Sequence, residues 1–206
     1  MTPTGFWTND LEGTTLRMNQ CLLQFDTAAN RPASSAATKG MLYVATDTLV
    51  VSYDNGSTWV EMARDIGARV YDASGQSIAN ATHTKVNFDR EDYDTDNIHD
   101  KVTNNTRLTC KTAGKYLIFA SNQWGTNSTG ERLLELFLNN TTPICRQGMR
   151  ADAGAGGSVS LSLATVFDLA VNDYLEIRVY QNSGGSLIIN PGTSVSPVLG
   201  MQLVGT

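Results

Sequence analysis

The stretch from Ala113 to Asn140 constrains the fold of this chain more than any other. Residues 116–120 form an unbroken apolar run that follows Gly114 and Lys115. Short runs of this kind, bounded by glycine and rich in aromatic and β-branched residues, are typical of strands buried on both faces. Residues 125–130 form a polar loop by composition, and residues 132–138 resume the β pattern. The stretch therefore predicts two long strands, and the first needs a second layer or a partner chain to cover it.

The rest of the chain also favours strands, because no segment shows a convincing helical period. Further strands are predicted at residues 40–48, 49–54, 58–62, 68–71, 107–111, 143–147, 158–167, 173–180 and 197–204. Short strands at roughly ten-residue spacing are typical of sandwiches and jelly rolls. The predicted fold class is all-β: an antiparallel two-sheet jelly-roll sandwich at the C-terminal end, preceded by a small β-meander and an extended N-terminal arm.

Three segments follow from this pattern. Residues 1–39 are predicted to be an N-terminal arm and linker that anchors the chain, residues 40–64 a small β-meander, and residues 65–206 the jelly-roll domain. The arm is read as either extended or a short helix, and its apolar side chains must be buried against the other domain, a sister chain or a larger assembly. The candidate anchoring residues are Leu16, Met18, Leu22 and Phe25.

Composition excludes several classes of partner. The net charge of −5 argues against nucleic acid, which requires a basic face, and against docking on an anionic membrane surface. No apolar stretch approaches the length of a membrane helix, so membrane insertion is not expected. The start of the sequence lacks the pattern of a secretion signal, which predicts synthesis in a bacterial cytoplasm. The cysteines at 21, 110 and 145 are read as buried apolar residues rather than as a disulfide or zinc framework.

The meander has a recognisable sequence pattern. Asn55-Gly56 accepts the positive φ of a tight hairpin turn between the strands at 49–54 and 58–62. Residues Gly40 to Asp47 and Tyr53 to Val60 resemble a module that recurs in bacteriophage tail and head proteins, of the form Gly-x-Leu-Tyr-Val-Ala-Thr-Asp-Thr followed by Tyr-x-x-Gly-Ser-Thr-Trp-Val. The resemblance implies a virion-associated protein, and it does not specify which part of the virion.

Residues 68–206 are similar to the globular head of the complement recognition proteins and to their tumour-necrosis-factor-like relatives. The residues that carry this resemblance are Ala68-Arg69-Val70, Phe88-Asp89, Asp94-Thr95, Gly114 to Phe119, Asp173 to Val179 and the apolar final strand. Asn172 stands where that family usually has a glycine. The resemblance implies a jelly roll assembled as a trimer, with aromatic and aliphatic side chains meeting at the threefold axis.

The two most apolar runs of the domain, residues 116–119 and 198–204, agree with such a trimer because they hold more apolar surface than one sandwich core should need. The alternative is that they are central strands of a single domain. The residues assigned to this trimer interface or core are Tyr116, Ile118, Phe119, Leu199, Met201 and Leu203.

The densest cluster of ionisable residues is the acidic segment from Asp89 to Asp100. Asp92, Asp94 and Asp96 alternate like the first ligands of a calcium loop, and oxygen-rich irregular segments can wrap Ca²⁺. Asn97 stands where such a loop has its glycine, and Thr103 where it has its last glutamate. The competing interpretation is a solvated loop whose side chains cap turns. Apart from this candidate Ca²⁺ site, no cofactor is predicted.

Catalytic motifs are not evident. The two histidines, His83 and His99, lie in no triad or zinc-ligand pattern, so the chain is not expected to be an enzyme. The loops at 125–130 and 151–157 are candidates for a recognition surface, because loops on a rigid scaffold often carry binding residues.

Three functions remain open. The first is a structural protein on the surface of a tailed-phage virion, a trimeric head fibre or capsid decoration protein that attaches to capsid or tail proteins. The second is a tail-associated receptor-binding protein that grips host surface glycans or proteins. The third is a calcium-dependent lectin-like module.

Overall fold

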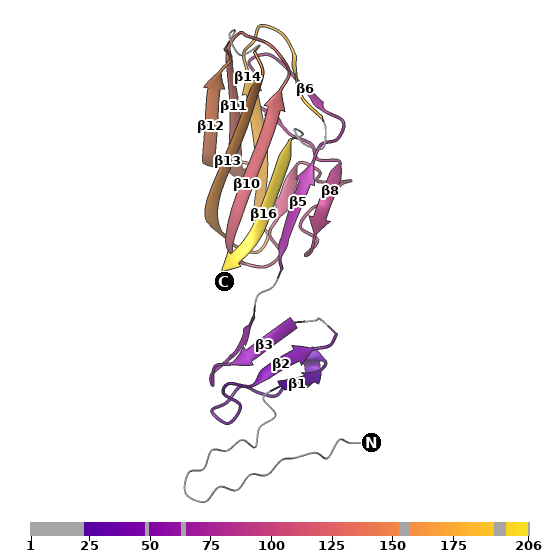
Figure 1. The fold of residues 1–206 in the computed structure, drawn as a ribbon, viewed down its shortest axis with the longest axis vertical. Coiled ribbons are helices and arrows are strands. Elements are labelled where there is room, and N and C mark those ends of the chain that lie inside the picture. The colour runs from indigo at the N-terminus through magenta and orange to yellow at the C-terminus, as the bar shows by residue number, and fades with distance from the viewer. Residues whose placement is uncertain (1–22, 48–49, 63–64, 153–156, 192–196, 206) are drawn as a thin grey trace, which may run out of the picture. The chain divides into compact units, whose positions relative to one another are not determined.

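The computed structural model describes residues 23–47, 50–62, 65–152, 157–191 and 197–205. The chain divides into two compact units, Met1–Arg64 and Asp65–Thr206, called here the small unit and the large unit, and both are built from strands (Figure 1). Within the described ranges, helical structure is limited to one short turn, η1 (Ala28–Asn30). No helix in these ranges is long and apolar enough to cross a membrane.

The small unit holds one four-stranded sheet, sheet A, in the order β1-β2-β3-β4. Its strands are β1 (Leu23–Asp26), β2 (Leu42–Ala45), β3 (Val50–Asp54) and β4 (Trp59–Glu61). Gly56 has a φ of +95° in the turn between β3 and β4, as the Asn-Gly hairpin requires. β1 pairs with β2 in parallel. Residues 23–26 are thus extended, as an edge strand of this sheet. Of the two alternatives for the arm, the short helix is wrong for these residues, and they belong to the sheet that was predicted to begin at residue 40.

One face of sheet A is covered by residues 27–40 of the same chain. Tyr43 and Trp59 meet edge to face there, at 5.7 Å between ring centroids. Their polar atoms donate hydrogen bonds to the covering segment, Tyr43 Oη to the Thr27 carbonyl at 2.6 Å and Trp59 Nε1 to the Pro32 carbonyl at 2.7 Å. Asp54 is buried on this face. The small unit therefore has a covered side with satisfied polar groups.

The Asp54 carboxylate links β3 to the covering segment. It accepts hydrogen bonds from Ser34 Oγ, Thr38 Oγ1 and the Ser35 amide, and one from the Gly56 amide in the hairpin turn. Burial alone would raise the pKa of Asp54, but these hydrogen bonds outweigh it and lower the pKa from 3.8 to about 2.

We expect the small unit to lose stability in acid through Asp54. Because the folded-state pKa is depressed, the stabilisation is complete above about pH 4 and is lost as the pH falls towards about 2. The NMR signal of the Trp59 indole N–H, followed between these pH values, should broaden or shift as residues 32–38 detach. Asp54→Asn should abolish the pH dependence of that signal in this window, and an unchanged titration in this variant would contradict the assignment.

The large unit holds two antiparallel sheets. Sheet B has the order β6-β15-β10-β16-β5-β8, with β13 paired to the other edge of β10. Its strands are β5 (Gly67–Tyr71), β6 (Gln76–Ile78), β8 (Arg90–Asp94), β10 (Gly114–Trp124), β13 (Val159–Leu169), β15 (Leu187–Ile189) and β16 (Val198–Gly205). β13, β10, β16, β5 and β8 lie side by side in Figure 1.

Sheet C has the order β12-β11-β14-β7, with β9 also paired to β14. Its strands are β7 (Thr84–Lys85), β9 (Arg107–Thr109), β11 (Glu131–Leu138), β12 (Thr142–Arg150) and β14 (Tyr174–Gln181). The core lies between the two sheets, and includes Tyr116 and Ile118 from β10, Leu134 and Leu136 from β11, and Ile177 from β14. The predicted all-β fold class, an antiparallel two-sheet jelly-roll sandwich, is confirmed.

Two local predictions for the large unit are met only in part within one chain. Residues 116–120 are not buried on both faces in one chain: burial alternates along β10, and Leu117 keeps 40% of its surface exposed. Strands buried on both faces are β11 over Leu133–Leu136 and β16 over Val198–Met201. The acidic segment is not wholly a loop, because Arg90–Asp94 form β8 and pair with β5.

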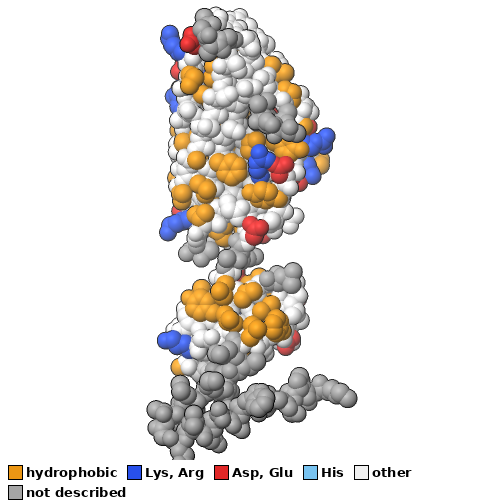
Figure 2. Space-filling view, viewed as in Figure 1, with side chains coloured by type: hydrophobic (Ala, Val, Ile, Leu, Met, Phe, Trp, Pro, Cys, Tyr) orange, Lys and Arg blue, Asp and Glu red, His pale blue; other side chains and the backbone are white. Residues whose placement is uncertain are grey.

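Hydrophobic side chains differ in their distribution between the two units. Figure 2 shows them gathered on the visible surface of the small unit, whereas on the large unit they are dispersed among polar side chains.

Candidate functional site

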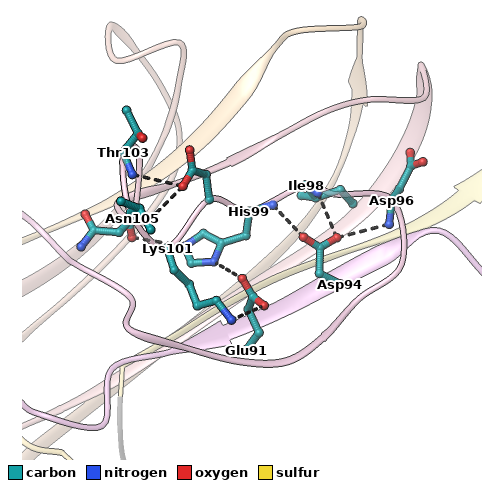
Figure 3. Close-up of polar contacts among 10 residues, drawn as sticks. Glu91, Asp94, Asp96, Ile98, His99, Lys101, Thr103 and Asn105 are labelled. Atoms are coloured by element: carbon teal, nitrogen blue, oxygen red, sulfur yellow. Dashed lines mark hydrogen bonds and ion pairs between the residues drawn. The ribbon is translucent and has the colours of Figure 1, made fainter.

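The acidic segment is the first candidate site, and Figure 3 shows its polar contacts. Asp94, at the end of β8, accepts hydrogen bonds from three backbone amides. The amides of Asp96 (3.2 Å) and Ile98 (2.9 Å) donate to Oδ1, and the His99 amide (2.9 Å) donates to Oδ2. Asn97 takes a positive φ of 52° in the same turn. Asp94 therefore caps the turn that follows β8.

The two other candidate calcium ligands have separate partners. Asp92 forms an ion pair with Arg69 on the neighbouring strand β5, and Asp96 accepts a hydrogen bond from Thr112 Oγ1 at 2.9 Å. The three carboxylates thus serve three different contacts instead of sharing one. Across the ranges that the structure describes, no three His, Cys, Asp or Glu side chains are grouped so that they could hold a metal ion. The geometry gives the predicted Ca²⁺ site no ligand set.

Both histidines contact glutamates. The His99 side chain is fully buried; its Nδ1 lies 2.8 Å from Glu91 Oε1, and its Nε2 lies 3.4 Å from the Asn105 carbonyl (Figure 3). Lys101 Nζ lies 3.0 Å from the second Glu91 oxygen. Burial raises the pKa of Glu91, but hydrogen bonds from His99 and Lys101 outweigh it and hold the pKa below its usual value. This cluster ties residues 99–105 to β8.

The outer face of sheet C is charged. Its cross-strand neighbours include Glu135 beside Arg178 and Arg146, and Arg178 beside Lys85. Lys85 Nζ lies 2.8 Å from Glu176 Oε1. Glu135 has two partners: its Oε2 lies 2.7 Å from His83 Nδ1, and its Oε1 lies 3.5 Å from Arg146 Nε. Glu135 and Glu176 are themselves buried, whereas the Lys85, His83 and Arg146 side chains that lie over them are 40–57% exposed. This face therefore presents charged and polar side chains to water.

The outer face of sheet B is different. Along the middle stretch of each of the adjacent strands β13, β10 and β16, the outward side chains carry no charge. The registers place these side chains there: Leu117, Phe119, Ser121 and Gln123 on β10, Ser160, Ser162, Ala164 and Val166 on β13, and Val198, Gly200 and Gln202 on β16. We call this set the uncharged face. Charges begin at its borders: Lys115 lies opposite Asp168 at one end, and Arg69 on β5 lies opposite Gly200. Val166 is 57% exposed, and Leu117 is 40% exposed.

Phe119 lies at the centre of the uncharged face against Gly200. A Cβ built on Gly200 would lie 2.2 Å from Cζ of the Phe119 ring. The ring therefore occupies the space that a side chain at position 200 would need, and it lies close to the sheet while keeping part of its surface exposed. This contact gives the face a broad apolar centre.

The predicted trimer residues divide into two groups. Tyr116, Ile118, Leu199 and Met201 are fully buried inside one chain, so their side chains are not available to another chain. Leu203 is partly buried and packs against the same core, whereas Phe119 belongs to the uncharged face. Leu117 and Val166, the most exposed large apolar residues of the uncharged face, were not in the predicted set. Strict alternation from the inward Tyr116 would have placed Leu117 on the outer face.

The structure describes one of the four predicted anchoring residues, Phe25. Leu16, Met18 and Leu22 lie outside the described residues. Phe25 lies on β1 and is 63% exposed.

Two loops named as a recognition surface meet at one end of the sandwich. The Asn127 amide donates to the Gly157 carbonyl at 3.1 Å, which joins the loop at 125–130 to the end of the loop at 151–157. Arg132 is fully buried beneath them. Its guanidinium donates to the carbonyls of Thr129 at 2.9 Å, Glu131 at 3.1 Å and Asn127 at 3.1 Å. Burial lowers the pKa of Arg132.

Arg132→Ala is expected to loosen these loops. Loss of three charge-assisted hydrogen bonds to backbone carbonyls should lower the free energy of unfolding by about 2–3 kcal/mol, and amide exchange at Asn127 should accelerate at least about tenfold because its protection depends on the held loop. Urea denaturation and hydrogen exchange measure the two effects. Arg150→Ala, at an exposed arginine of β12, is the control and should change neither. Unaltered exchange at Asn127 in Arg132→Ala would contradict this role.

Comparisons with known proteins found a similarity among solved structures and none in sequence. No protein-family model matches the chain, and no curated protein matches it. Among solved structures, the fold is similar to the globular domain of zebrafish complement 1qA protein, at 19% sequence identity and a TM-score of 0.49, over 68% of this chain and 98% of that chain.

Proposed function

We propose that this chain is a non-enzymatic structural protein on the exterior of a tailed-phage virion, a homotrimer that serves as a head fibre or capsid decoration protein. Three large units associate through the uncharged face. Residues 1–22 attach the assembly to the capsid, and the sandwich projects outward. Synthesis takes place in the cytoplasm of the host bacterium.

The observation that carries this proposal is the difference between the two outer faces of the sandwich. The face of sheet C carries paired acidic and basic side chains, whereas on the uncharged face the residues directly across from Leu117, Phe119 and Val166 on the paired strands are all uncharged. Depletion of charge with aromatic and aliphatic side chains at the centre is the composition of interface cores. The difference supports burial of one particular face against other protein.

The number of chains and the location rest on the two sequence resemblances. The similarity of residues 68–206 to complement-type heads supports three chains. The phage-type pattern at Gly40–Asp47 and Tyr53–Val60 supports a virion, and these residues include strand β2, the end of β3 and the start of β4.

Attachment can be tested with phage particles that lack this protein. We expect the purified chain to bind such particles, and removal of residues 1–22 to abolish binding while the free assembly still contains three chains. The control is Gly184→Ser, in an exposed turn where a Cβ meets no atom within 4 Å, although its φ of +96° adds local strain. It should bind like the unaltered chain. Binding that persists without residues 1–22 would contradict the proposed anchor.

A receptor-binding role at the tail is the second candidate, and the joined loops favour it. The hydrogen bond from Asn127 to Gly157 and the buried Arg132 hold two polar loops in one place, which is how rigid scaffolds present recognition loops. Binding of purified protein to host cells that is lost in Arg132→Ala, but kept after removal of residues 1–22, would favour this role over the first.

A further inference from the structure

The second face of sheet A is apolar at every strand position that the structure describes. The registers align Leu23 with Leu42, Leu42 with Tyr53, and Tyr53 with Val60. One step further along, Phe25 aligns with Val44 and Val44 with Val51, and the Met62 amide bonds to the Val51 carbonyl. We call this set the apolar face of sheet A: Leu23, Phe25, Leu42, Val44, Val51, Tyr53, Val60 and Met62.

This face lacks a cover within the described part of the chain. Phe25 is 63% exposed, Met62 47% and Tyr53 40%. Residues 27–40 already pack on the opposite side of the sheet, where Tyr43 and Asp54 are buried. A sheet with one wet face normally alternates apolar and polar side chains, and sheet A does not. Its composition indicates burial on both sides.

We infer that the apolar face of sheet A packs against the same face of two sister chains, so that the small units form a second contact within the homotrimer. This inference rests on the proposed trimer of the large units. Identical copies suit this face because it carries no charge, and like charges therefore do not meet across the contact.

Chain connectivity favours sister chains over a separate partner such as a capsid protein. β4 ends at Glu61 and β5 begins at Gly67, and so short a connection spans at most about 20 Å. When three large units associate, three small units are thus held at an effective concentration in the millimolar range. They meet one another before they meet a capsid protein, and an apolar face of this extent would otherwise stay in water.

Photo-crosslinking in the full-length chain tests this inference. Tyr53 is replaced by the photoreactive amino acid p-benzoylphenylalanine, in an equal mixture of ¹⁴N-labelled and ¹⁵N-labelled chains, and the cross-linked peptides are mapped by mass spectrometry. We expect mixed-isotope products that join position 53 to residues 42–62 of a sister chain. The same replacement at Glu61, which alternates with Val60 and points to the other side of the sheet, is the control and should give at least about tenfold less of this product.

Light scattering on the same samples separates the possible failures. A mass of three chains with cross-links only to residues 1–22, or with no product between chains, would overturn the inference and leave the proposed trimer intact. A mass of one chain would overturn both. A product between sister small units, together with a mass of three chains, is the outcome that supports it.

Discussion

Leu117→Asp is expected to convert the assembly of three chains into single chains of 22.3 kDa. Leu117 lies on the uncharged face, with 40% of its surface exposed in one chain, so a carboxylate there is solvated in the monomer. In the proposed trimer it would be removed from water beside Val166 and Gln202, which carry no charge, and the nearest cation on this face, Lys115, already lies opposite Asp168. Burial of an unpaired charge should raise the dissociation constant of each contact at least about a hundredfold.

The mass is measured by light scattering, and circular dichroism checks that Leu117→Asp remains folded. The matched control is Val102→Asp, which adds the same charge at a position that is 91% exposed in a turn. We expect the control to keep the mass of three chains. A folded Leu117→Asp chain that still forms trimers would show that the uncharged face is not the contact.

Ile118→Ala is expected to have a large effect of a different kind. Ile118 is the next residue of β10, but it faces the core between the two sheets and is fully buried. Removal of its side chain leaves a cavity, which should lower the free energy of unfolding of the large unit by about 2–5 kcal/mol. The mass of the folded assembly should stay unchanged, because no atom of the uncharged face is lost.

Urea denaturation measures the stability of Ile118→Ala, and Val171→Ala is the control. Val171 is 53% exposed in the turn before β14, and its truncation should change stability by less than about 0.5 kcal/mol. A large loss of stability from Ile118→Ala together with dissociation of Leu117→Asp would place the core and the contact on opposite sides of one strand. A stable Ile118→Ala chain that dissociates would reverse that assignment.

Alternating strands of the large unit were predictable from sequence because their pattern is local. β13 and β14 alternate between core and outer side chains along most of their length, and period-two alternation identifies a half-buried strand directly. β8 could not be found in this way, since Arg90–Asp94 contains one aromatic residue among charged ones. Its pairing with β5 depends on contacts such as the Arg69–Asp92 ion pair, which no local pattern encodes.

The orientation of β10 shows why its outward-facing residues were only partly predicted. Tyr116 to Ala120 are all apolar, so periodicity does not say which of them face inward. A shift of one residue exchanges the two faces of a strand, and Tyr116 and Ile118 face the core while Leu117 and Phe119 face outward. The surplus of apolar residues was evident from the sequence, but their assignment needed the register with β13 and β16.

β1 was missed for a different reason. Leu23–Asp26 pairs in parallel with β2, and residues 27–41 separate the two strands. Parallel pairing is non-local and leaves no hairpin signal between the strands. Phe25 was therefore assigned to an anchoring arm, whereas the structure places it on the apolar face of sheet A.

The most direct test of self-association is the mass of the unaltered chain in solution. Sedimentation equilibrium over a wide range of concentrations should return about three times 22.3 kDa at micromolar concentration, with Leu117→Asp at the mass of one chain in the same buffer. A folded, soluble species of 22.3 kDa at every concentration would contradict the account, because the uncharged face would then remain in water without a partner.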